Sequence, residues 1–289
     1  MKRASIIAAS HQRGHRQTAL FIGPTGSGKT EIWRVLQGEV PHIKIIDGSQ
    51  LCASNYKGDL HIRDIFMDTV SKAEAERLLI VIDEADKMFE PVISNSGTDY
   101  SMIIQNNLLK ILDGDTLTFT VQAKATDRTF TVDCKRVSVV FLGAFEMLMD
   151  KLSSNSQNAR KSIGFGANIT PQTLTHRNVT IDDLIRYGNI RREIAGRLQS
   201  VTVLDPVDAQ GFRHILDTPS MSPINSLSRE YDCNILVDEH LKDLLCTEAS
   251  EQRLGVRYIN NQLRMLVEDA LYENPEEHTL LLTRNPLTG

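Results

Sequence analysis

The sequence has few of the features that mark secreted, metal-binding or membrane proteins. Its four cysteines (52, 134, 233 and 246) are scattered without a Cys-x-x-Cys spacing, and its eight histidines form no pair at metal-binding spacing. Free, reduced cysteines are therefore favoured over a disulfide framework or a zinc site. No apolar run approaches the length of a membrane span, and the apolar part of the amino-terminal segment is too short for a signal peptide. We expect a cytoplasmic protein without a membrane partner.

The composition is also poor in positive charge. Thirty-seven acidic residues against 32 Lys and Arg give a formal net charge of −5, so the chain as a whole has no attraction for nucleic acid. The net charge leaves a local basic patch open. With 289 residues, of which 41% are hydrophobic, the chain can form one large or two modest globular domains.

A glycine-rich loop between a predicted strand and a predicted helix is the most informative feature. It follows the apolar run 19–22 and consists of Gly23, Pro24, Thr25, Gly26, Ser27, Gly28, Lys29 and Thr30. Such a loop turns backbone N–H groups onto phosphates at a helix N-terminus, while its lysine reaches the β- and γ-phosphates and its threonine hydroxyl binds Mg²⁺. The alternative is a chance glycine-rich turn. The strand before it and the helix after it favour ATP and Mg²⁺ as ligands.

A second apolar run, residues 78–82, ends in Asp83 and Glu84. A continuous apolar run is typical of a central parallel strand covered on both faces. Asp83 suits a Mg²⁺ position, and Glu84 is placed to activate the attacking water as a base. The alternative is a pair of solvated acids at a strand end. Lys29 and Glu84 are thus candidate catalytic residues, and an acid pair favours hydrolysis over passive binding.

Predicted strands and helices alternate through the first two thirds of the chain. Strands are expected at 44–47, 78–82 and 137–142, helices at 62–76 and 101–112, and a hairpin from 116–123 and 128–134. The fold class is therefore α/β, a P-loop core whose parallel sheet is sandwiched by helices. Asp205-Pro206 marks a boundary between a domain at 1–204 and a small, mainly helical C-terminal domain at 205–289. The latter has its clearest helices at 238–246 and 256–272.

The phosphate loop, the segment 82–87 and the segment 105–114 together resemble the AAA+ ATPases, and within them the ClpX unfoldases. Further matching segments follow in the same order at 143–145, 163–167, 194–198 and 254–259, so the resemblance covers almost everything from residue 18 onward. It implies a homo-oligomeric ring, commonly a hexamer, in which ATP lies between subunits. Hydrolysis would drive loops that pull protein substrates through a central pore.

The resemblance also implies roles for single residues. Arg197 matches the arginine finger that stabilises γ-phosphate charge in the neighbouring subunit, although it could instead pair on its own surface. Arg257 matches the second sensor, which contacts nucleotide from the small domain.

Two loops match segments that contact other proteins in the family. Tyr56, Lys57 and Gly58 match the pore loop that grips substrate, with an ordinary exposed turn as the alternative. Ile163, Gly164 and Phe165 resemble the tripeptide that docks on a ClpP-like peptidase, unless this apolar tip packs on its own domain.

Four departures separate the chain from the ClpX pattern. The family's N-terminal zinc-binding domain, its Val/Ile-Gly-Gln segment beside adenine and its Arg-Lys-His pore segment are not found, and no first-sensor Asn or Thr follows the strand 137–142. Three functions are therefore compared: a protein unfoldase serving a peptidase, a stand-alone remodelling ATPase, and a non-hydrolytic nucleotide-gated binding module. Glu84 argues against the third. A DNA motor is disfavoured because no basic helix offers a phosphate track.

Overall fold

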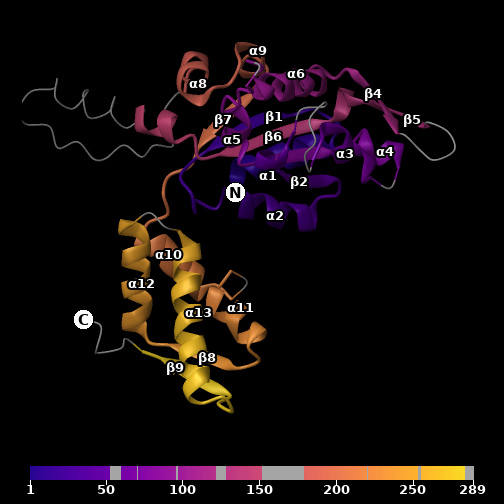
Figure 1. The fold of residues 1–289 in the computed structure, drawn as a ribbon. Coiled ribbons are helices and arrows are strands. Elements are labelled where there is room, and N and C mark those ends of the chain that lie inside the picture. The colour runs from indigo at the N-terminus through magenta and orange to yellow at the C-terminus, as the bar shows by residue number, and fades with distance from the viewer. Residues whose placement is uncertain are drawn as a thin grey trace, which may run out of the picture. The chain divides into compact units, whose positions relative to one another are not determined.

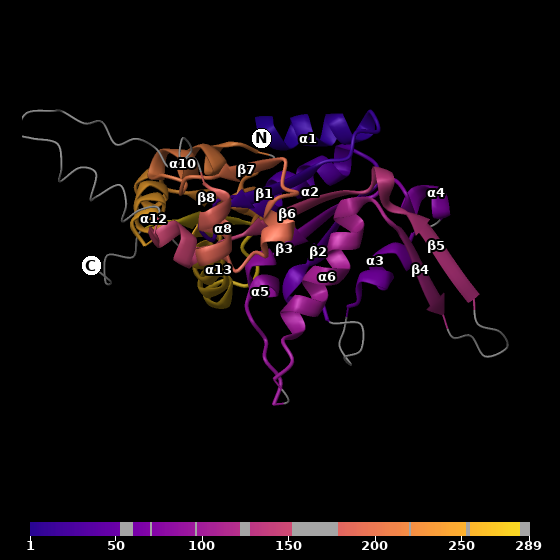
Figure 2. The ribbon, with the colours of Figure 1, turned by 90° about the horizontal axis from the view of Figure 1, so that it is seen from above.

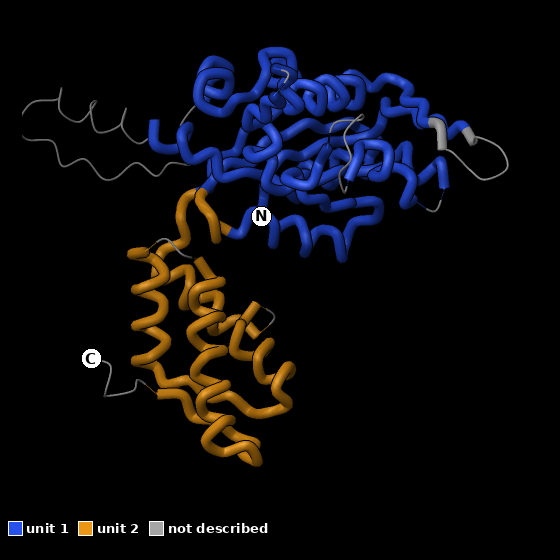
Figure 3. The backbone as a smooth tube through the Cα atoms, in the orientation of Figure 1, with its two compact units in different colours: residues 1–23, 28–204 blue, residues 24–27, 205–289 orange. Residues whose placement is uncertain are grey.

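The computed structural model describes residues 1–52, 60–69, 71–95, 97–121, 128–151, 179–219, 221–252 and 255–283. The chain divides into two compact units. Unit 1 comprises residues 1–23 and 28–204, and unit 2 comprises residues 24–27 and 205–289 (Figure 3). Within the described part, no helix is long and apolar enough to cross a membrane. Each unit is described by itself below.

Unit 1 is built on a five-stranded parallel sheet with the order β2-β3-β6-β1-β7 (Figure 1). The strands are β1 (Thr18–Ile22), β2 (Ile43–Asp47), β3 (Leu79–Asp83), β6 (Ser138–Gly143) and β7 (Ser200–Val203). β1 is buried along its whole length and pairs with β6 on one side and β7 on the other. The predicted α/β class with a parallel sheet is confirmed.

Alternate side chains of β1 enter separate cores on the two faces of the sheet. Leu20 and Ile22 belong to one core, whereas Ala19 and Phe21 belong to the other. This alternation follows from the two-residue period of a strand. The second face is covered by α1 (Lys2–Gln12) and α2 (Lys29–Glu39), whose Trp33 packs edge-to-face on Phe21.

The first face is covered by the remaining helices of unit 1 (Figures 1 and 2). These are α3 (Ile62–Met67), α4 (Lys72–Ala75), α5 (Ala85–Phe89), α6 (Tyr100–Asp113), α8 (Ile181–Gly188) and α9 (Arg192–Ala195). Short 3₁₀ turns lie at η1 (Gly48–Gln50) and η2 (Cys134–Arg136). The helices named here therefore pack on one or other face of a single sheet, which leaves its strand ends to carry sites.

The single helix predicted over 62–76 is wrong, because the structure has two helices there. The Ser71 hydroxyl accepts a hydrogen bond from the Glu74 amide and so caps a new helix, α4. Thr69 donates its hydroxyl to the Phe66 carbonyl. Such local side-chain bonds compete with helix continuation. The predicted hairpin is confirmed as β4 (Thr116–Val121) and β5 (Arg128–Asp133), which pair antiparallel.

Unit 2 is mainly helical and has its own core. Its elements are α10 (Ala209–Asp217), α11 (Pro223–Glu230), β8 (Asn234–Val237), α12 (Glu239–Glu251), α13 (Val256–Glu273) and β9 (Thr279–Leu282). β8 and β9 pair in parallel. Apolar residues from every one of these elements form the core, among them Phe212, Leu245, Leu263 and Leu280.

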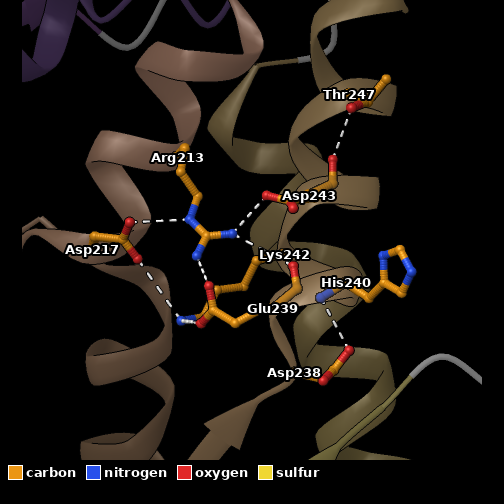
Figure 4. Close-up of polar contacts among 8 residues, drawn as sticks. All are labelled: Arg213, Asp217, Asp238, Glu239, His240, Lys242, Asp243 and Thr247. Carbon is orange, nitrogen blue, oxygen red and sulfur yellow. Dashed lines mark hydrogen bonds and ion pairs between the residues drawn. The ribbon is translucent and has the colours of Figure 1, made fainter.

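One arginine connects α10 to α12 in unit 2 (Figure 4). Arg213 donates from Nε to Asp217 at 3.0 Å, on its own helix, and from Nη1 to Asp243 at 2.7 Å, on α12. Its Nη2 contacts the Glu239 carboxylate, which also pairs with Lys242 at 2.8 Å. The guanidinium therefore serves three carboxylates and fixes the register of the two helices.

Candidate functional site

The phosphate loop leaves the carboxyl end of β1 and turns directly into α2. Gly26 and Gly28 have φ angles of 79° and 80°, a left-handed conformation that glycine adopts without steric cost. Gly28 is the N-cap of α2, so the N-terminus of this helix, where backbone N–H groups point out of the helix, adjoins the loop. This arrangement of glycines, backbone N–H groups and a helix N-terminus suits an anionic phosphate chain.

Lys29 and Thr30, the first two residues of α2, make different contacts. Lys29 Nζ donates to the Gly23 carbonyl at 2.5 Å, and the Thr30 hydroxyl donates to Asp83 Oδ2 at 2.6 Å. Burial lowers the pKa of Lys29, and the negative charges of Asp83 and Asp86 oppose that shift. Since Asp83 ends β3, the hydrogen bond joins two segments that lie 53 residues apart.

Thr30 and Asp83 also fit a magnesium ion by their chemistry. Mg²⁺ prefers oxygen ligands and is typically held by one or two protein oxygens together with substrate phosphates and water. Among the described residues, no three His, Cys, Asp or Glu side chains gather into a metal-binding cluster. The hydroxyl and carboxylate pair therefore suits a metal that is shared with a bound triphosphate, rather than one enclosed by protein alone.

Glu84 follows β3 in a left-handed conformation, with φ 51° and ψ 36°, and is the N-cap of α5. Its amide donates to Asp83 Oδ1 at 3.0 Å, and its carboxylate accepts from Lys87 Nζ at 2.6 Å. The hydrogen bond to Glu84 raises the pKa of Lys87. Because both side chains of this pair are about half exposed, at 45% and 56%, the ion pair is weak and readily exchanged for water or a ligand.

The neighbouring strand ends come very close to this acid pair. A Cβ added to Gly48, at the end of β2, would lie 2.8 Å from the Asp83 carbonyl oxygen. One added to Gly143, at the end of β6, would lie 2.7 Å from Asp86 Oδ1. Asp86 accepts a hydrogen bond from the Phe145 amide at 3.3 Å. The two glycines therefore set the close packing that fixes the acidic segment.

Arg197, the expected arginine finger, pairs with Asp113 of its own chain. Its Nε and Nη2 donate to the two carboxylate oxygens at 2.5 and 2.9 Å, and Nη1 donates to the Glu193 carbonyl at 2.6 Å. The pair joins the segment after α9 to the end of α6, which lie side by side (Figure 1). The hydrogen bond to Arg197 lowers the pKa of Asp113. The sequence left two roles open for Arg197, a finger for the neighbouring subunit or a pair on its own surface. In the single chain, Arg197 is paired with Asp113 on its own surface.

Arg257 lies in the first turn of α13 in unit 2. It is exposed and forms no ion pair with any residue in the described ranges. Gly255, two residues earlier, has φ 74°, and a Cβ there would lie 2.6 Å from the Cα of Gly26 within the same unit. The predicted pore loop, Tyr56 to Gly58, and the predicted docking tip, Ile163 to Phe165, lie outside the described residues.

Three residues of the site were missed by the sequence argument. Asp86 and Lys87 are adjacent to the predicted acid pair, and their charges within a five-residue span were a usable signal. Asp113 had no such signal, because its contact with Arg197 spans 84 residues. In unit 1, hydrogen bonds join Thr30, Asp83 and Glu84, and Lys29 lies close enough to Asp83 for that negative charge to act on its pKa. Arg197 lies in unit 1 and is paired with Asp113, whereas Arg257 belongs to unit 2.

A phosphate loop between β1 and a helix, and an acid pair after the buried strand β3, which β6 separates from β1, define a P-loop nucleoside triphosphatase on a parallel sheet. The family described as "ATPase family associated with various cellular activities (AAA)" matches residues 19–166, just over half of the chain. The chain belongs to this family, and it is therefore a nucleotide-binding ATPase.

Within the family, the chain is similar to proteins named ATP-dependent Clp protease ATP-binding subunit ClpX. It is 25% identical to that of Porphyromonas gingivalis over 285 residues, which cover 90% of this chain and 67% of the relative. It is 26% identical to the protein of Bacteroides fragilis, over 91% of this chain and 66% of the relative. It is 27% identical to that of Borrelia duttonii, over 90% of this chain and 64% of the relative. The chain thus spans about two thirds of the length of these relatives, and it is a ClpX-like AAA ATPase.

Proposed function

We propose that this ATPase couples hydrolysis to protein unfolding, threads polypeptides through the pore of a homo-oligomeric ring and delivers them to a ClpP-like peptidase. The observation that carries the proposal is the joined site of Thr30, Asp83 and Glu84 on a chain that is similar to ClpX over about nine tenths of its length. A site assembled for hydrolysis on this framework supports a motor rather than a passive nucleotide-gated module.

The four unit 1 residues divide the proposed chemistry among them. Lys29, already held against the loop by its bond to Gly23, turns its ammonium to the β- and γ-phosphates. Thr30 and Asp83 hold Mg²⁺, which neutralises charge on the phosphates when bound. Glu84 accepts a proton from the attacking water and orients it toward the γ-phosphate. Separation from Lys87 frees its carboxylate for this step.

The proposed ring places ATP between subunits. The large α/β domain at 1–204 supplies the phosphate loop, and the small domain at 205–289 supplies Arg257 as a sensor of the bound nucleotide. Arg197 acts on the neighbouring subunit's γ-phosphate. We infer that Asp113 holds Arg197 in place at the subunit surface, because the two-point contact fixes the plane of the guanidinium.

The loops expected to meet substrate and peptidase follow from the sequence alone. Tyr56, Lys57 and Gly58 are proposed to grip the translocating chain, since an aromatic ring packs on any extended backbone. Ile163, Gly164 and Phe165 are proposed to dock into apolar clefts of the peptidase. Tyr56→Ala should therefore keep ATPase activity and lose unfolding of a tagged fluorescent protein, whereas Tyr56→Phe should keep both. Loss of ATPase activity in Tyr56→Ala would contradict the pore role.

The test of the whole proposal compares the parent with Glu84→Gln, using Glu90→Gln as a matched control. Glu90 is an exposed glutamate at the end of the same helix, α5. Removal of a general base is expected to lower turnover by about 10²- to 10⁴-fold. Steady-state ATPase assays, with mass in solution measured in the presence of ATP, should show a ring that binds nucleotide in all three proteins and hydrolyses it in two.

Addition of a ClpP-like peptidase then separates the candidate functions. A change in ATPase rate together with ATP-dependent loss of a folded fluorescent substrate supports the unfoldase. Unfolding of that substrate without any response to the peptidase would restrict the function to stand-alone remodelling. Equal turnover by the parent and Glu84→Gln would refute the proposed catalytic role of the acid pair.

A further inference from the structure

A cavity of unit 1 lies at the amino-terminal edge of the sheet, at the end opposite the phosphate loop. It has a volume of about 450 Å³ and is lined by residues that immediately precede four neighbouring strands. Arg13 and His15 precede β1, His42 precedes β2, Arg77 precedes β3 and Arg136 precedes β6. The phosphate loop follows the opposite end of β1, about 16 Å away for five residues at roughly 3.3 Å each. We call this cavity the basic pocket.

The basic pocket concentrates positive charge in an acidic protein. Three arginines line it, and no Asp or Glu does. In the part of the chain that the structure describes, Arg13, Arg77 and Arg136 form no ion pair, whereas other arginines, including Arg197 and Arg213, are paired with carboxylates. All three arginines are exposed, so solvent screens their mutual repulsion. Three guanidinium groups without carboxylate partners around one cavity nevertheless give it a positive potential that attracts anions.

Hydrogen bonds hold together the segments that line the basic pocket. The Gln17 amide donates to Ser138 Oγ at 2.9 Å, so the Ser138 hydroxyl hydrogen is free to donate to His11 Nδ1 at 2.8 Å. His11 Nε2–H then donates to the Arg77 carbonyl at 2.9 Å. A neutral His11 satisfies this chain of bonds, and burial, which lowers the pKa of His11, favours that neutral form. It ties the end of α1 to β6 and to the backbone of Arg77.

The segments on both sides of the basic pocket are also held by backbone hydrogen bonds. Gly14, with φ 88°, ends α1 in a left-handed turn, and the His15 amide returns to the Ser10 carbonyl at 3.2 Å. On the other side, the His42 carbonyl accepts from the Leu79 amide at 2.9 Å. The His42 side chain lies 3.9 Å from the Glu74 carboxylate, which does not itself line the pocket. The negative end of the α1 dipole amounts to roughly half a charge and only partly offsets three arginines.

We propose that the basic pocket binds a small anion that carries two or more phosphate groups, as a second phosphate site separate from the ATP site. Arginine presents a planar fork that pairs with phosphate oxygens two at a time, and three forks around one cavity exceed what a single carboxylate can use. A volume of about 450 Å³ lies within the usual range of roughly 300–1,000 Å³ for small-molecule sites. Both free polyphosphate and the phosphate chain of a nucleotide share this chemistry.

Calorimetry with inorganic triphosphate tests the proposal on the full chain. A Lys29→Ala background weakens the phosphate loop as a competing site. In that background, triphosphate should bind, and the added pair Arg77→Gln and Arg136→Gln should weaken binding by about tenfold or more, because two charge-assisted contacts are lost. Arg186→Gln removes an exposed arginine of α8, distant in the chain, and should leave binding unchanged. Circular dichroism confirms that each variant is folded.

The two sources of phosphate are separated by titrating ATP beside triphosphate. Equal affinities assign recognition to the phosphates alone, and tighter ATP binding adds a contact to the nucleoside; both support the site. Triphosphate should also protect Arg13, Arg77 and Arg136 from phenylglyoxal, as read by peptide mass spectrometry. Undetectable binding at millimolar triphosphate, equal binding of citrate, or an unchanged affinity in the double variant would overturn the proposal.

Discussion

Arg197→Ala offers the sharpest test of the ring mechanism, because its two proposed roles predict effects of different size. As a surface partner of Asp113, Arg197 makes a two-point contact in which the side chains are 35% and 41% exposed. Solvent screening limits such a pair to about 1 kcal/mol or less. Loss of that contact should lower Tm by roughly 2–4 °C for a body of this size. Even if the whole ~1 kcal/mol of this ion pair were added to the activation barrier, the rate of hydrolysis would fall only about fivefold.

As a finger for the neighbouring subunit, Arg197 should contribute much more. Arginine fingers account for about 10³- to 10⁵-fold in turnover. Asp113→Ala is the matched variant, since it removes the same ion pair and keeps the guanidinium. We expect both variants to lose similar stability by calorimetric melting. At saturating ATP, Asp113→Ala should lose at most about fivefold in ATPase activity, because the finger is less firmly held, whereas Arg197→Ala should lose about 10³-fold or more.

Subunit mixing then tests whether the contact acts between chains. Arg197→Ala subunits retain Glu84, and Glu84→Gln subunits retain Arg197. Mixed rings therefore contain interfaces in which one subunit supplies the base and its neighbour the finger. ATPase activity should rise above that of either variant alone. Small and equal losses in Arg197→Ala and Asp113→Ala, or no recovery on mixing, would refute the finger and leave the arginine with a role on its own surface.

Three further predictions concern stability and reactivity. Gly48→Ala should destabilise unit 1 by about 1–3 kcal/mol in urea melts, because its Cβ would lie 2.8 Å from a backbone carbonyl oxygen. Gly38→Ala, in an open helical position, should stabilise unit 1 by roughly 0.5–1 kcal/mol, and equal effects of the two substitutions would contradict the close approach at Gly48. Burial lowers the pKa of His11, so the unfolded chain takes up a proton before the folded chain does as the pH falls below about 6.5. The free energy of unfolding should therefore drop between pH 7 and 5, and less steeply in His11→Gln. Parallel slopes in the two proteins would exclude this histidine as the cause. Burial raises the pKa of Cys134 to about 12, which leaves only ~1 thiolate in 10⁴ at pH 8. Mass spectrometry should therefore show that iodoacetamide modifies the half-buried Cys52 before Cys134, and early labelling of Cys134 would show that its site opens.

The sequence predicted the parts of the fold that have a strong local pattern. The apolar runs of β1, β3 and β6 are buried on both faces, so their composition alone indicated a parallel sheet. The short strand β7 was not predicted, because three of its four residues are only partly buried and give no clear period. The helix expected over 62–76 failed at a serine whose capping bond outweighs helix propensity.

The candidate site divides in the same way. Lys29, Thr30 and Asp83 could be assigned because a phosphate loop and a strand-end acid are local motifs. The pairing of Arg197 with Asp113 and the basic pocket could not, since each depends on side chains that are far apart in sequence and meet only in the folded sheet. No periodicity reports which strand ends will be neighbours. That information resides in the order β2-β3-β6-β1-β7.

The backbone at Glu84 has a consequence for how this protein can be stabilised. Its left-handed conformation is one that glycine or asparagine adopts more easily than glutamate, at a difference of roughly 1 kcal/mol. Selection for thermal resistance alone would thus replace Glu84, and a library sorted only by melting temperature should enrich glycine there. The proposed base occupies a position where folding favours another residue. Selection for stability and selection for turnover would therefore favour different residues at position 84.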